Sequence, residues 1–317
     1  MLDRFGRKIE YLRISVTQDC NLKCVYCIQG MRTNSCSKLL PEDIEKIVGI
    51  MAGLGIRKVR ITGGEPLMRH DICDIIRGIS GIYGIEDISL TTNGIMLGEK
   101  VHKLKMAGLK RVNISLDSLK TDRFASMTGG GRLEAVLDGI GKSIEAGLNP
   151  VKVNTVLIKG INDDEIEDFI LLAKEYPIEV RFIELMPIGK FGEQNIDKVV
   201  YNTEIIALHP DLIPCSREDG SNGPARCFML EGYKGRIGFI SPLSHKFCSC
   251  CNRIRLTCDG KIRTCLGDNN EFDITGLLGH DDNVLNDAVK DIIDKKPVGH
   301  CFEHGFNSNR NMNAIGG

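Results

Sequence analysis

Residues 110–117 read KRVNISLD, and this stretch decides which α/β fold the sequence predicts. Apolar residues occupy positions 112, 114 and 116, and polar residues occupy positions 113, 115 and 117. Because successive side chains of a strand point to opposite faces, one face of this strand is apolar and the other is polar. The strands of a parallel sheet that helices cover on both sides should instead be apolar on both faces. The alternation therefore favours an open barrel, whose polar face lines a lumen.

Similar strand-like runs recur along the first part of the chain. From about residue 9 to about residue 185, short β-rich runs alternate with longer segments of helical periodicity. The runs cover residues 10–16, 57–62, 86–92, 110–117, 150–157 and 178–185. Six strands with intervening helices predict parallel βαβ units with right-handed crossovers. We therefore expect an α/β fold built around parallel strands.

The helical periodicity is clearest in three places. Pro41 stands in the first turn of a predicted helix, whose apolar stripe covers residues 44–54. A second apolar stripe covers residues 133–144. Asn162 followed by Glu165 resembles a capping box at the start of a third helix.

The last third of the chain has a different character. A chain of 317 residues is long enough for one large domain and a smaller one. After about residue 190 the alternation of strands and helices ends, and most of the remaining cysteines follow. We expect a smaller α+β extension packed on the barrel, so that the two domains are residues 1–190 and residues 191–317.

Basic residues stand on the predicted strands, where the barrel interpretation places them in the lumen. They are Arg13, Lys58, Arg60, Lys152 and Arg181. Two unit charges about 8 Å apart repel each other by about 2 kcal/mol at an effective dielectric constant near 20. For any single residue, pairing with Asp or Glu or reaching to solvent is an equally good interpretation. For the whole set, an anionic ligand is the better one.

The composition and the first residues limit which binding partners and which cellular compartment we expect for this protein. A formal net charge of −1 gives no global reason to expect nucleic acid or a membrane surface as a partner. No apolar run approaches the roughly 18 residues of a membrane span. The first residues, MLDRFGRKIEYL, lack the apolar core of a secretory signal. We therefore expect a cytoplasmic protein whose 13 cysteines are metal ligands or buried thiols and not disulfides.

The stretch CNLKCVYC follows the first predicted strand and holds Cys20, Cys24 and Cys27. Loops at the carboxyl ends of barrel strands commonly carry the chemistry. A cubane iron–sulfur cluster has four irons, so three thiolates leave one iron free to bind a substrate. The alternative interpretation is a zinc site that a distant cysteine such as Cys36 completes.

A second cysteine-rich stretch reads FCSCCNRIRLTCDGKIRTC. Cys248, Cys251 and Cys265 form a CxxC pair followed at a distance by one more cysteine. Cys250 and Cys258 leave the choice of ligands open. On spacing alone, a zinc site and an iron–sulfur site are equally consistent with this pattern.

Arg253 and Arg255 lie just after these cysteines on a predicted strand. Their i, i+2 spacing points both side chains to the same side. A pair of guanidinium groups suits the oxygen atoms of a phosphate, which again indicates an anion beside the metal ligands. The alternative is a pair of solvated surface arginines.

Gly63-Gly64-Glu65-Pro66 stands at the end of the second predicted strand. Two glycines let the backbone approach a ligand closely, although a Gly-Gly turn alone is a weak signal. The chain has no GxxxxGK(S/T) motif, which argues against a P-loop nucleotide hydrolase. It also lacks GxGxxG after the first strand, which disfavours a dinucleotide dehydrogenase.

Taken together, these motifs resemble a known group of enzymes. CxxxCxxC with an aromatic residue before the last cysteine, followed by GGEP, is similar to the radical S-adenosylmethionine (SAM) superfamily. The stretches RISVT, RITGGEPL, LTTNG, NISLDS, RFIELMP, FCxxCNRxRLT and the terminal IGG resemble one family within it, the GTP 3′,8-cyclases of molybdenum cofactor biosynthesis. The resemblance spans essentially the whole chain.

This resemblance implies a partial (β/α)6 barrel with a C-terminal extension and two [4Fe-4S] clusters. It implies that the first cluster binds SAM and is held by Cys20, Cys24 and Cys27. It implies that the open iron of the second cluster binds the guanine base and that this cluster is held by Cys248, Cys251 and Cys265. The residues implied at the SAM site are Tyr26, Gly64, Ser115 and Met186. The residues implied to hold GTP are Arg13, Lys58, Arg60, Thr91, Lys152, Arg181, Arg253 and Arg255.

The implied reaction starts with reductive cleavage of SAM to a 5′-deoxyadenosyl radical. This radical takes hydrogen from the 3′ carbon of the ribose of GTP, and the substrate radical attacks carbon 8 of guanine. The implied partners are a low-potential electron donor, a downstream cyclic pyranopterin monophosphate synthase that receives the cyclic product, and a second copy of the chain in a homodimer.

Two further roles follow from the resemblance. We hypothesise that Arg253 and Arg255 stabilise charge that develops near the guanine as well as binding the substrate. The terminal Gly316 and Gly317 are implied to reach into the active site, whereas a chain end is ordinarily frayed. One departure from the family pattern is the pair that follows Cys27, which is Ile-Gln where the family usually has Met-Pro.

Two other functions stay open at this point. The first is a radical SAM enzyme that has an auxiliary cluster and modifies a peptide, although it gives no reason for the paired arginines or the basic lumen. The second is a zinc-stabilised binding protein without catalytic activity.

Overall fold

Strand β1 (Tyr11–Ser15) lies inside a sheet of 12 strands in the computed structural model, which describes residues 1–27, 38–216, 223–302, 306 and 308–316. The strand order is β12-β11-β10-β1-β2-β3-β4-β5-β6-β9-β8-β7. The strands of the first part of the chain are β2 (Lys58–Thr62), β3 (Asp87–Thr92), β4 (Arg111–Ser115), β5 (Val151–Leu157) and β6 (Ile178–Glu184). Those of the last third are β7 (Ile213–Pro214), β8 (Ala225–Met229), β9 (Arg236–Ile240), β10 (Arg253–Leu256), β11 (Lys261–Arg263) and β12 (Phe272–Asp273).

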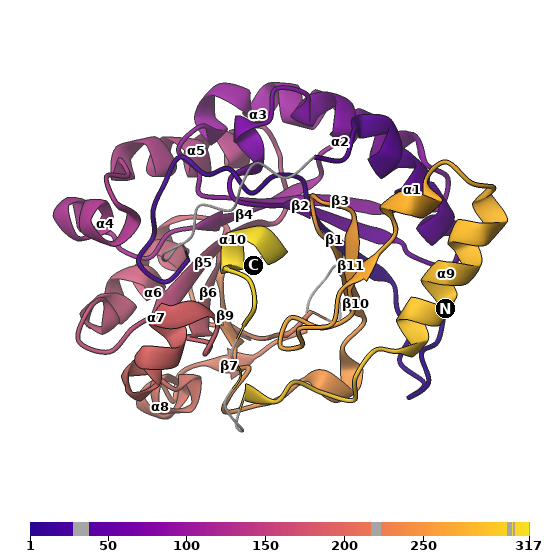
Figure 1. The fold of residues 1–317 in the computed structure, drawn as a ribbon. Helices are drawn as coiled ribbons and strands as arrows, with labels where there is room; N and C mark the ends of the chain where they lie inside the picture. Colours follow the sequence, from indigo (N-terminus) through magenta and orange to yellow (C-terminus); the bar gives the residue numbers. More distant parts are fainter. Residues whose placement is uncertain (28–37, 217–222, 303–305, 307, 317) are drawn as a thin grey trace.

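The six predicted strands are β1 to β6, and neighbouring strands among them are parallel. The prediction of an α/β fold with a parallel core is therefore confirmed. The C-terminal extension contributes a further parallel strand on each side, since β10 pairs with β1 and β9 pairs with β6. Figure 1 shows this sheet curled around an interior that the C-terminal helix α10 enters.

The helices follow the strands in the order that the sequence predicts. The longer ones are α1 (Pro41–Gly53), α2 (Ile72–Gly81), α3 (Leu97–Met106), α4 (Thr121–Thr128), α5 (Leu133–Glu145), α6 (Ile166–Glu175) and α9 (Asp282–Asp294). The shorter ones are α7 (Gly189–Gln194), α8 (Asn202–Leu208) and α10 (Met312–Ile315). Single 3-10 turns are η1 (Pro66–Met68), η2 (Asp163–Glu165), η3 (Ile196–Lys198), η4 (Cys248–Cys250) and η5 (Thr275–Leu277). Helices α1 to α6 line the outside of the curved sheet (Figure 1).

Two of the three predicted helix signals are confirmed. Helix α1 begins at Pro41, and most of its apolar stripe is buried, as is most of that of α5, where Leu137 is exposed. The predicted capping box is wrong, because the Asn162 side chain caps no helix. Its amide nitrogen instead donates to the carbonyl oxygens of Asp117 and Val156, at 2.7 and 2.9 Å. Asn162 is thus a cross-link between the ends of two strands, which a local pattern cannot reveal.

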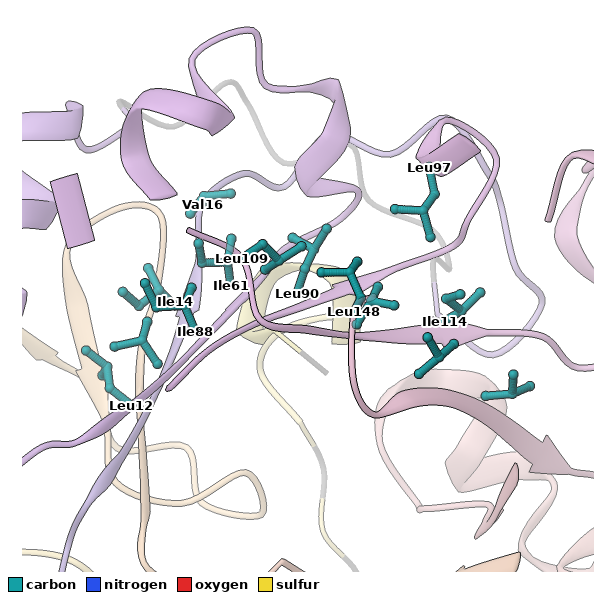
Figure 2. Packing of buried hydrophobic residues seen from close by; sticks show 14 of the residues in the cluster. Leu12, Ile14, Val16, Ile61, Ile88, Leu90, Leu97, Leu109, Ile114 and Leu148 are labelled. Carbon is teal, nitrogen blue, oxygen red and sulfur yellow. The ribbon is translucent and has the colours of Figure 1, made fainter. Parts of the chain in front are cut away.

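The apolar face of the sheet forms the main core. Leu12 and Ile14 on β1 have no exposed surface, and Ile14 lies opposite Ile61, which lies opposite Leu90. Figure 2 shows these side chains gathered between the strands and the surrounding helices. Because side chains alternate along each strand, this apolar face directs the polar residues at the intervening positions into the interior.

Two predictions concern the whole chain, namely its division into two domains and its lack of a membrane span. The sheet continues across the predicted boundary at residue 190, and the division into residues 1–190 and 191–317 stays a prediction. Among the described residues, no helix is both long enough and apolar enough to cross a membrane.

Replacing Leu12 by Ala should lower the free energy of unfolding by about 2–5 kcal/mol, because the substitution opens a cavity in the middle of the sheet. Urea unfolding followed by circular dichroism measures this change. Leu171→Ala on α6 is the matched control, since Leu171 is 49% exposed, and it should change stability by no more than about 0.5 kcal/mol. Equal effects of the two substitutions would contradict this account of the core.

Candidate active site

The polar face of the curved sheet lines a cavity of about 310 Å³. Residues of both cysteine sets and the basic strand residues meet on its walls. The predicted site residues that line it are Cys20, Cys24, Cys27, Cys248, Cys251, Cys265, Tyr26, Gly64, Ser115, Met186, Arg13, Lys58, Arg60, Thr91, Lys152, Arg181, Arg253 and Arg255. Tertiary structure thus brings together predicted site residues that are up to 252 positions apart, from Arg13 to Cys265.

The two cysteine sets lie toward opposite ends of one pair of strands. Tyr11 of β1 pairs in parallel with Arg253 of β10. Cys20 comes after the carboxyl end of β1, whereas Cys251 comes before the amino end of β10. Cys265 follows β11, which is antiparallel to β10, and therefore lies at the same end as Cys251. A strand of five residues spans roughly 16 Å, so an extended molecule fits between the two sets.

The first cysteine set is held by the backbone next to α4. Lys23 and Val25 donate their amide N–H groups to the carbonyl oxygens of Thr128 and Met127, at 2.8 and 3.0 Å. Burial raises the pKa of the Cys27 thiol to about 12, and repulsion from Cys20 adds to the rise. Burial also raises the pKa of Cys24 far above its ordinary value. Such thiols need a bound cation to become thiolates, which is what an iron cluster supplies.

Tyr26 is fixed between these cysteines by a buried carboxyl group. Its hydroxyl donates to Oδ2 of Asp117 at 2.6 Å, and Oδ1 of Asp117 accepts the N–H of Val156 at 2.9 Å. Burial raises the pKa of Asp117 to about 6 despite these hydrogen bonds. The aromatic ring therefore has one defined orientation on the cavity wall.

Gly64 lies where only a glycine fits. A Cβ atom at this position would lie 2.2 Å from the carbonyl oxygen of Asp19. The next residue, Glu65, secures the turn, since its carboxylate accepts the N–H groups of Asn93 and Leu67 at 2.7 and 3.0 Å. The Gly-Gly-Glu turn thus presents close-packed backbone to the cavity beside the first cysteine set.

The second cysteine set separates into thiols that reach the cavity and thiols that do not. Cys248, Cys251 and Cys265 line the cavity. Cys250 is exposed, with its sulfur 3.4 Å from the carbonyl oxygen of Phe247. Cys258 is buried in the core, away from the cavity lining. The geometry therefore favours Cys251 over Cys250, which spacing left open.

The charges around Cys251 prepare it to bind metal. Burial by itself raises its pKa, but the nearby charges of Arg253 and Lys296 outweigh burial and lower the pKa to about 6. The thiolate form is therefore populated at neutral pH, and the thiolate is the form that binds iron.

Each cysteine set fits an iron–sulfur cluster. Both present three soft sulfur donors on the wall of one cavity, and Cys36, which could complete a zinc site, lies outside the described residues. Within the described ranges, no three His, Cys, Asp or Glu side chains converge to hold one metal ion. A [4Fe-4S] cluster binds its cysteines through separate irons, so it needs no such convergence.

Arginines from three adjacent strands crowd the middle of the cavity. In the sheet register, Arg13 lies between Arg255 and Arg60. Burial first, and then repulsion from Arg253, lowers the pKa of Arg255 to about 9. Burial likewise lowers the pKa of Arg60 to about 10. An anionic ligand would relieve this repulsion, and an anionic ligand is what the sequence predicts for these basic residues taken together.

Two other basic residues are already paired. The carboxylate of Glu179 lies 3.4 Å from Nζ of Lys152 and 2.8 Å from Nε of Arg181. One carboxylate therefore neutralises part of the charge of these two cavity-lining cations, and their contact with an anionic ligand stays a prediction. Sequence reasoning missed Glu179, although its i, i+2 spacing from Arg181 on β6 places both side chains on the same face.

The C-terminal segment packs into the same cavity. Nη1 of Arg255 donates to the carbonyl oxygens of Ile315, at 3.1 Å, and of Gly316. Gly316 has a φ of +67°, and a Cβ atom there would lie 2.7 Å from Cγ2 of Thr62. Gly316 thus lies against the strands that carry the arginines, and Gly317 lies outside the described residues.

Several cavity-lining polar groups were not predicted. Asn154, Thr264 and Asn313 each have a buried side-chain oxygen without a hydrogen-bond partner in the described part of the chain, and so does the predicted Thr91. Lys296 also lines the cavity and is 2% exposed. The sequence gives no sign of Lys296, because a Lys-Lys pair after a helix ordinarily lies on the surface. Unsatisfied buried oxygens indicate room for a polar ligand.

Comparison with protein families agrees with this arrangement. Residues 14–173 match the family model described as the radical SAM superfamily, and residues 178–302 match the model described as Molybdenum Cofactor Synthesis C. The first match covers half of the chain.

Solved structures share the fold. The chain resembles Streptococcus suis SuiB bound to S-adenosylmethionine, with a TM-score of 0.58 and 16% identity over 92% of this chain and 65% of that one. It also resembles SuiB bound to the precursor peptide SuiA, with a TM-score of 0.62 and 16% identity over 92% of this chain and 66% of that one. At this identity the likeness shows the fold alone, so it does not favour a peptide substrate.

Full-length relatives are much more similar in sequence. The chain is 47% identical to the protein named GTP 3′,8-cyclase of Alkaliphilus oremlandii, and 48% identical to that of Clostridium botulinum. It is 47% identical to the protein of the same name of Clostridium acetobutylicum. Each alignment covers 100% of both proteins. The chain therefore belongs to the radical SAM superfamily and, within it, to the GTP 3′,8-cyclase family.

Proposed function

We propose that this protein is the enzyme that converts GTP into 3′,8-cyclo-7,8-dihydroguanosine 5′-triphosphate, the first step of molybdenum cofactor biosynthesis. The observation that carries the proposal is that two separate cysteine sets and a cluster of arginines line the same cavity. A peptide-modifying enzyme gives no reason for the arginines, and a zinc protein gives none for two three-cysteine sets. Membership of the cyclase family supports the same substrate.

Each cysteine set would hold its own cluster, and SAM would bind at the first set. Cys20, Cys24 and Cys27 would hold the first [4Fe-4S] cluster, with SAM against Tyr26 and Gly64. Ser115 and Met186 are also proposed contacts of SAM. Cys248, Cys251 and Cys265 would hold the second cluster. When bound, the first cluster supplies the electron for reductive cleavage of SAM.

The chain's own residues bind and orient the substrate between these ends. The arginines of β1 and β2 face the triphosphate, and the guanine is directed toward the second cysteine set and the arginines of β10. The proposed GTP contacts are Arg13, Lys58, Arg60, Thr91, Lys152, Arg181, Arg253 and Arg255. Holding both reactants in a closed lumen fixes the distance of the transferred hydrogen and excludes water from the radical.

Arg253 and Arg255 are proposed to act in the chemistry as well as in binding. They lie on β10, which begins two residues after Cys251, so their charges lie next to the guanine end of the lumen. Radical closure onto carbon 8 leaves charge near the guanine ring, and preorganised guanidinium groups stabilise such charge.

The family relationship also supports proposals about partners and location. A low-potential electron donor reduces the first cluster, and the product passes to a cyclic pyranopterin monophosphate synthase. The chain acts in the cytoplasm as a homodimer. Its active-site residues belong to two domains, which are residues 1–190 and residues 191–317. Neither nucleic acid nor a membrane has a part in this proposal.

Anaerobic incubation of the reconstituted protein with SAM, a strong reductant and GTP tests the function. We expect 5′-deoxyadenosine, detected by mass spectrometry, to increase with GTP and to appear together with a new species isomeric with GTP. Cleavage of SAM without dependence on GTP would contradict the substrate. A colourless preparation that contains zinc and no iron would contradict the whole radical interpretation.

Arg255→Ala should lower kcat at saturating GTP by about 10²-fold, because it removes a charge aimed at the developing charge on guanine. Steady-state kinetics with iron content held equal measures the change. Arg226→Ala is the matched control, since Arg226 is exposed on β8 and is not among the residues that line the cavity. Full turnover of Arg255→Ala at saturating GTP would leave this arginine a role in binding alone.

Removal of Gly316 and Gly317 should abolish product formation while both clusters still assemble, because the terminus packs against Arg255 and Thr62 in the cavity. Product is measured by mass spectrometry, and the clusters by iron content and visible absorption. Unchanged turnover of the truncated chain would mean that the terminus is an ordinary frayed end.

A further inference from the structure

Lys296 is a buried lysine that joins the two parts of the second cysteine set. It follows α9 and is 2% exposed. Its Nζ donates to the carbonyl oxygen of Arg253 at 2.8 Å and to that of Thr264. Arg253 is two residues after Cys251, and Thr264 immediately precedes Cys265. One ammonium group therefore holds together the two chain segments that carry these cysteines.

Among the described residues, the charge of Lys296 faces sulfur and not a carboxylate. Its hydrogen bonds go to the neutral carbonyl oxygens of Arg253 and Thr264. The charged groups that interact with it are the thiols of Cys251 and Cys265, which attract it, and the guanidinium groups of Arg7 and Arg253, which repel it. A buried cation is costly unless an anion balances it, and here the sulfur ligands are the available anions.

Arg7 shows what a purely structural cation looks like in the same region. It donates to the carbonyl oxygens of Cys248 and Pro297, at 3.0 and 2.7 Å, and so also supports the cysteine loop. However, its charge is balanced by the carboxylate of Asp3, whose Oδ2 lies 2.7 Å from Nε of Arg7. Lys296 has the same kind of backbone contacts without the carboxylate, so its charge is available to the cysteines.

We propose that Lys296 is a positioning residue of the second cluster whose positive charge raises the reduction potential of that cluster. The proposal rests on the proposed function's assignment of Cys248, Cys251 and Cys265 as ligands. Reduction adds one negative charge to the cluster, and a fixed cation within a poorly solvated site stabilises that added charge. The potential of an iron–sulfur cluster depends on net charge, hydrogen bonding and exposure in this way.

The test separates the charge of Lys296 from its hydrogen bonds. Lys296→Gln keeps a donor group for the carbonyl oxygens but loses the charge, whereas Lys296→Met loses both. Lys295→Met is the matched control, because this neighbouring lysine is exposed. The full-length chain carries Cys20→Ala, Cys24→Ala and Cys27→Ala throughout, so the remaining signal belongs to the second cluster. The potential is measured by redox titration with electron paramagnetic resonance.

We expect Lys296→Gln and Lys296→Met both to lower the reduction equilibrium constant at least tenfold, which is about 59 mV toward negative potential for one electron. Lys295→Met should leave the potential unchanged. An unchanged potential in Lys296→Gln with iron retained would overturn the proposal, because the hydrogen bonds alone would then explain the lysine.

Variants of Lys296 that lose iron are also informative in this experiment. If both neutral variants lose the cluster, Lys296→Arg decides: recovery of iron with the parent potential supports the charge, and failure to recover it assigns the lysine to packing and overturns the proposal. Absence of iron from the parent that retains Lys296 would overturn the ligand assignment itself. That result is distinct from a failure of the lysine's role, in which iron is present and the potential does not move.

Discussion

Like charges packed side by side inside the curved sheet are the constraint on which the rest of this structure depends. Arg13 lies between Arg60 and Arg255 in the register of three parallel strands. Burial and repulsion lower the pKa of each of these groups, so an anion bound beside them would stabilise their charged forms. The apolar opposite faces of the same strands, packed under the helices, hold them in place. Core stability is thus what keeps a strongly cationic site ready for an anion.

The C-terminal extension completes the site because its strands join the sheet. Pairing of β10 with β1 brings two more arginines and the second cysteine set to the lumen, and the terminal segment then contacts Arg255. The opposite positions of the two cysteine sets along this strand pair set the distance across which a substrate is held. This arrangement places two separate cysteine sets of one chain on the wall of the same cavity.

Buried charges in this protein fall into two kinds. Lys152 and Arg181 share the single carboxylate of Glu179, and Arg7 has Asp3, so these cations have a carboxylate beside them. The arginines of the lumen and Lys296 instead face carbonyl groups, sulfur or the cavity itself. Arg7 supports the fold, whereas the cations that line the cavity are directed at ligands and cofactors.

Sequence alone determined strands β1 to β6, the helices between them, the two cysteine-rich stretches and the basic residues of the lumen, because each depends on local periodicity or spacing. The alternation in residues 110–117 is a property of neighbouring residues, and β4 follows it. Tertiary structure alone decided the contacts of Asn162, Glu179 and Lys296 and that Cys251, and not Cys250, lines the cavity. Each of these depends on contacts or burial that pairing between distant strands creates. Such contacts leave no periodic trace in the chain, since hydrogen bonds and charges act through space and not along the sequence.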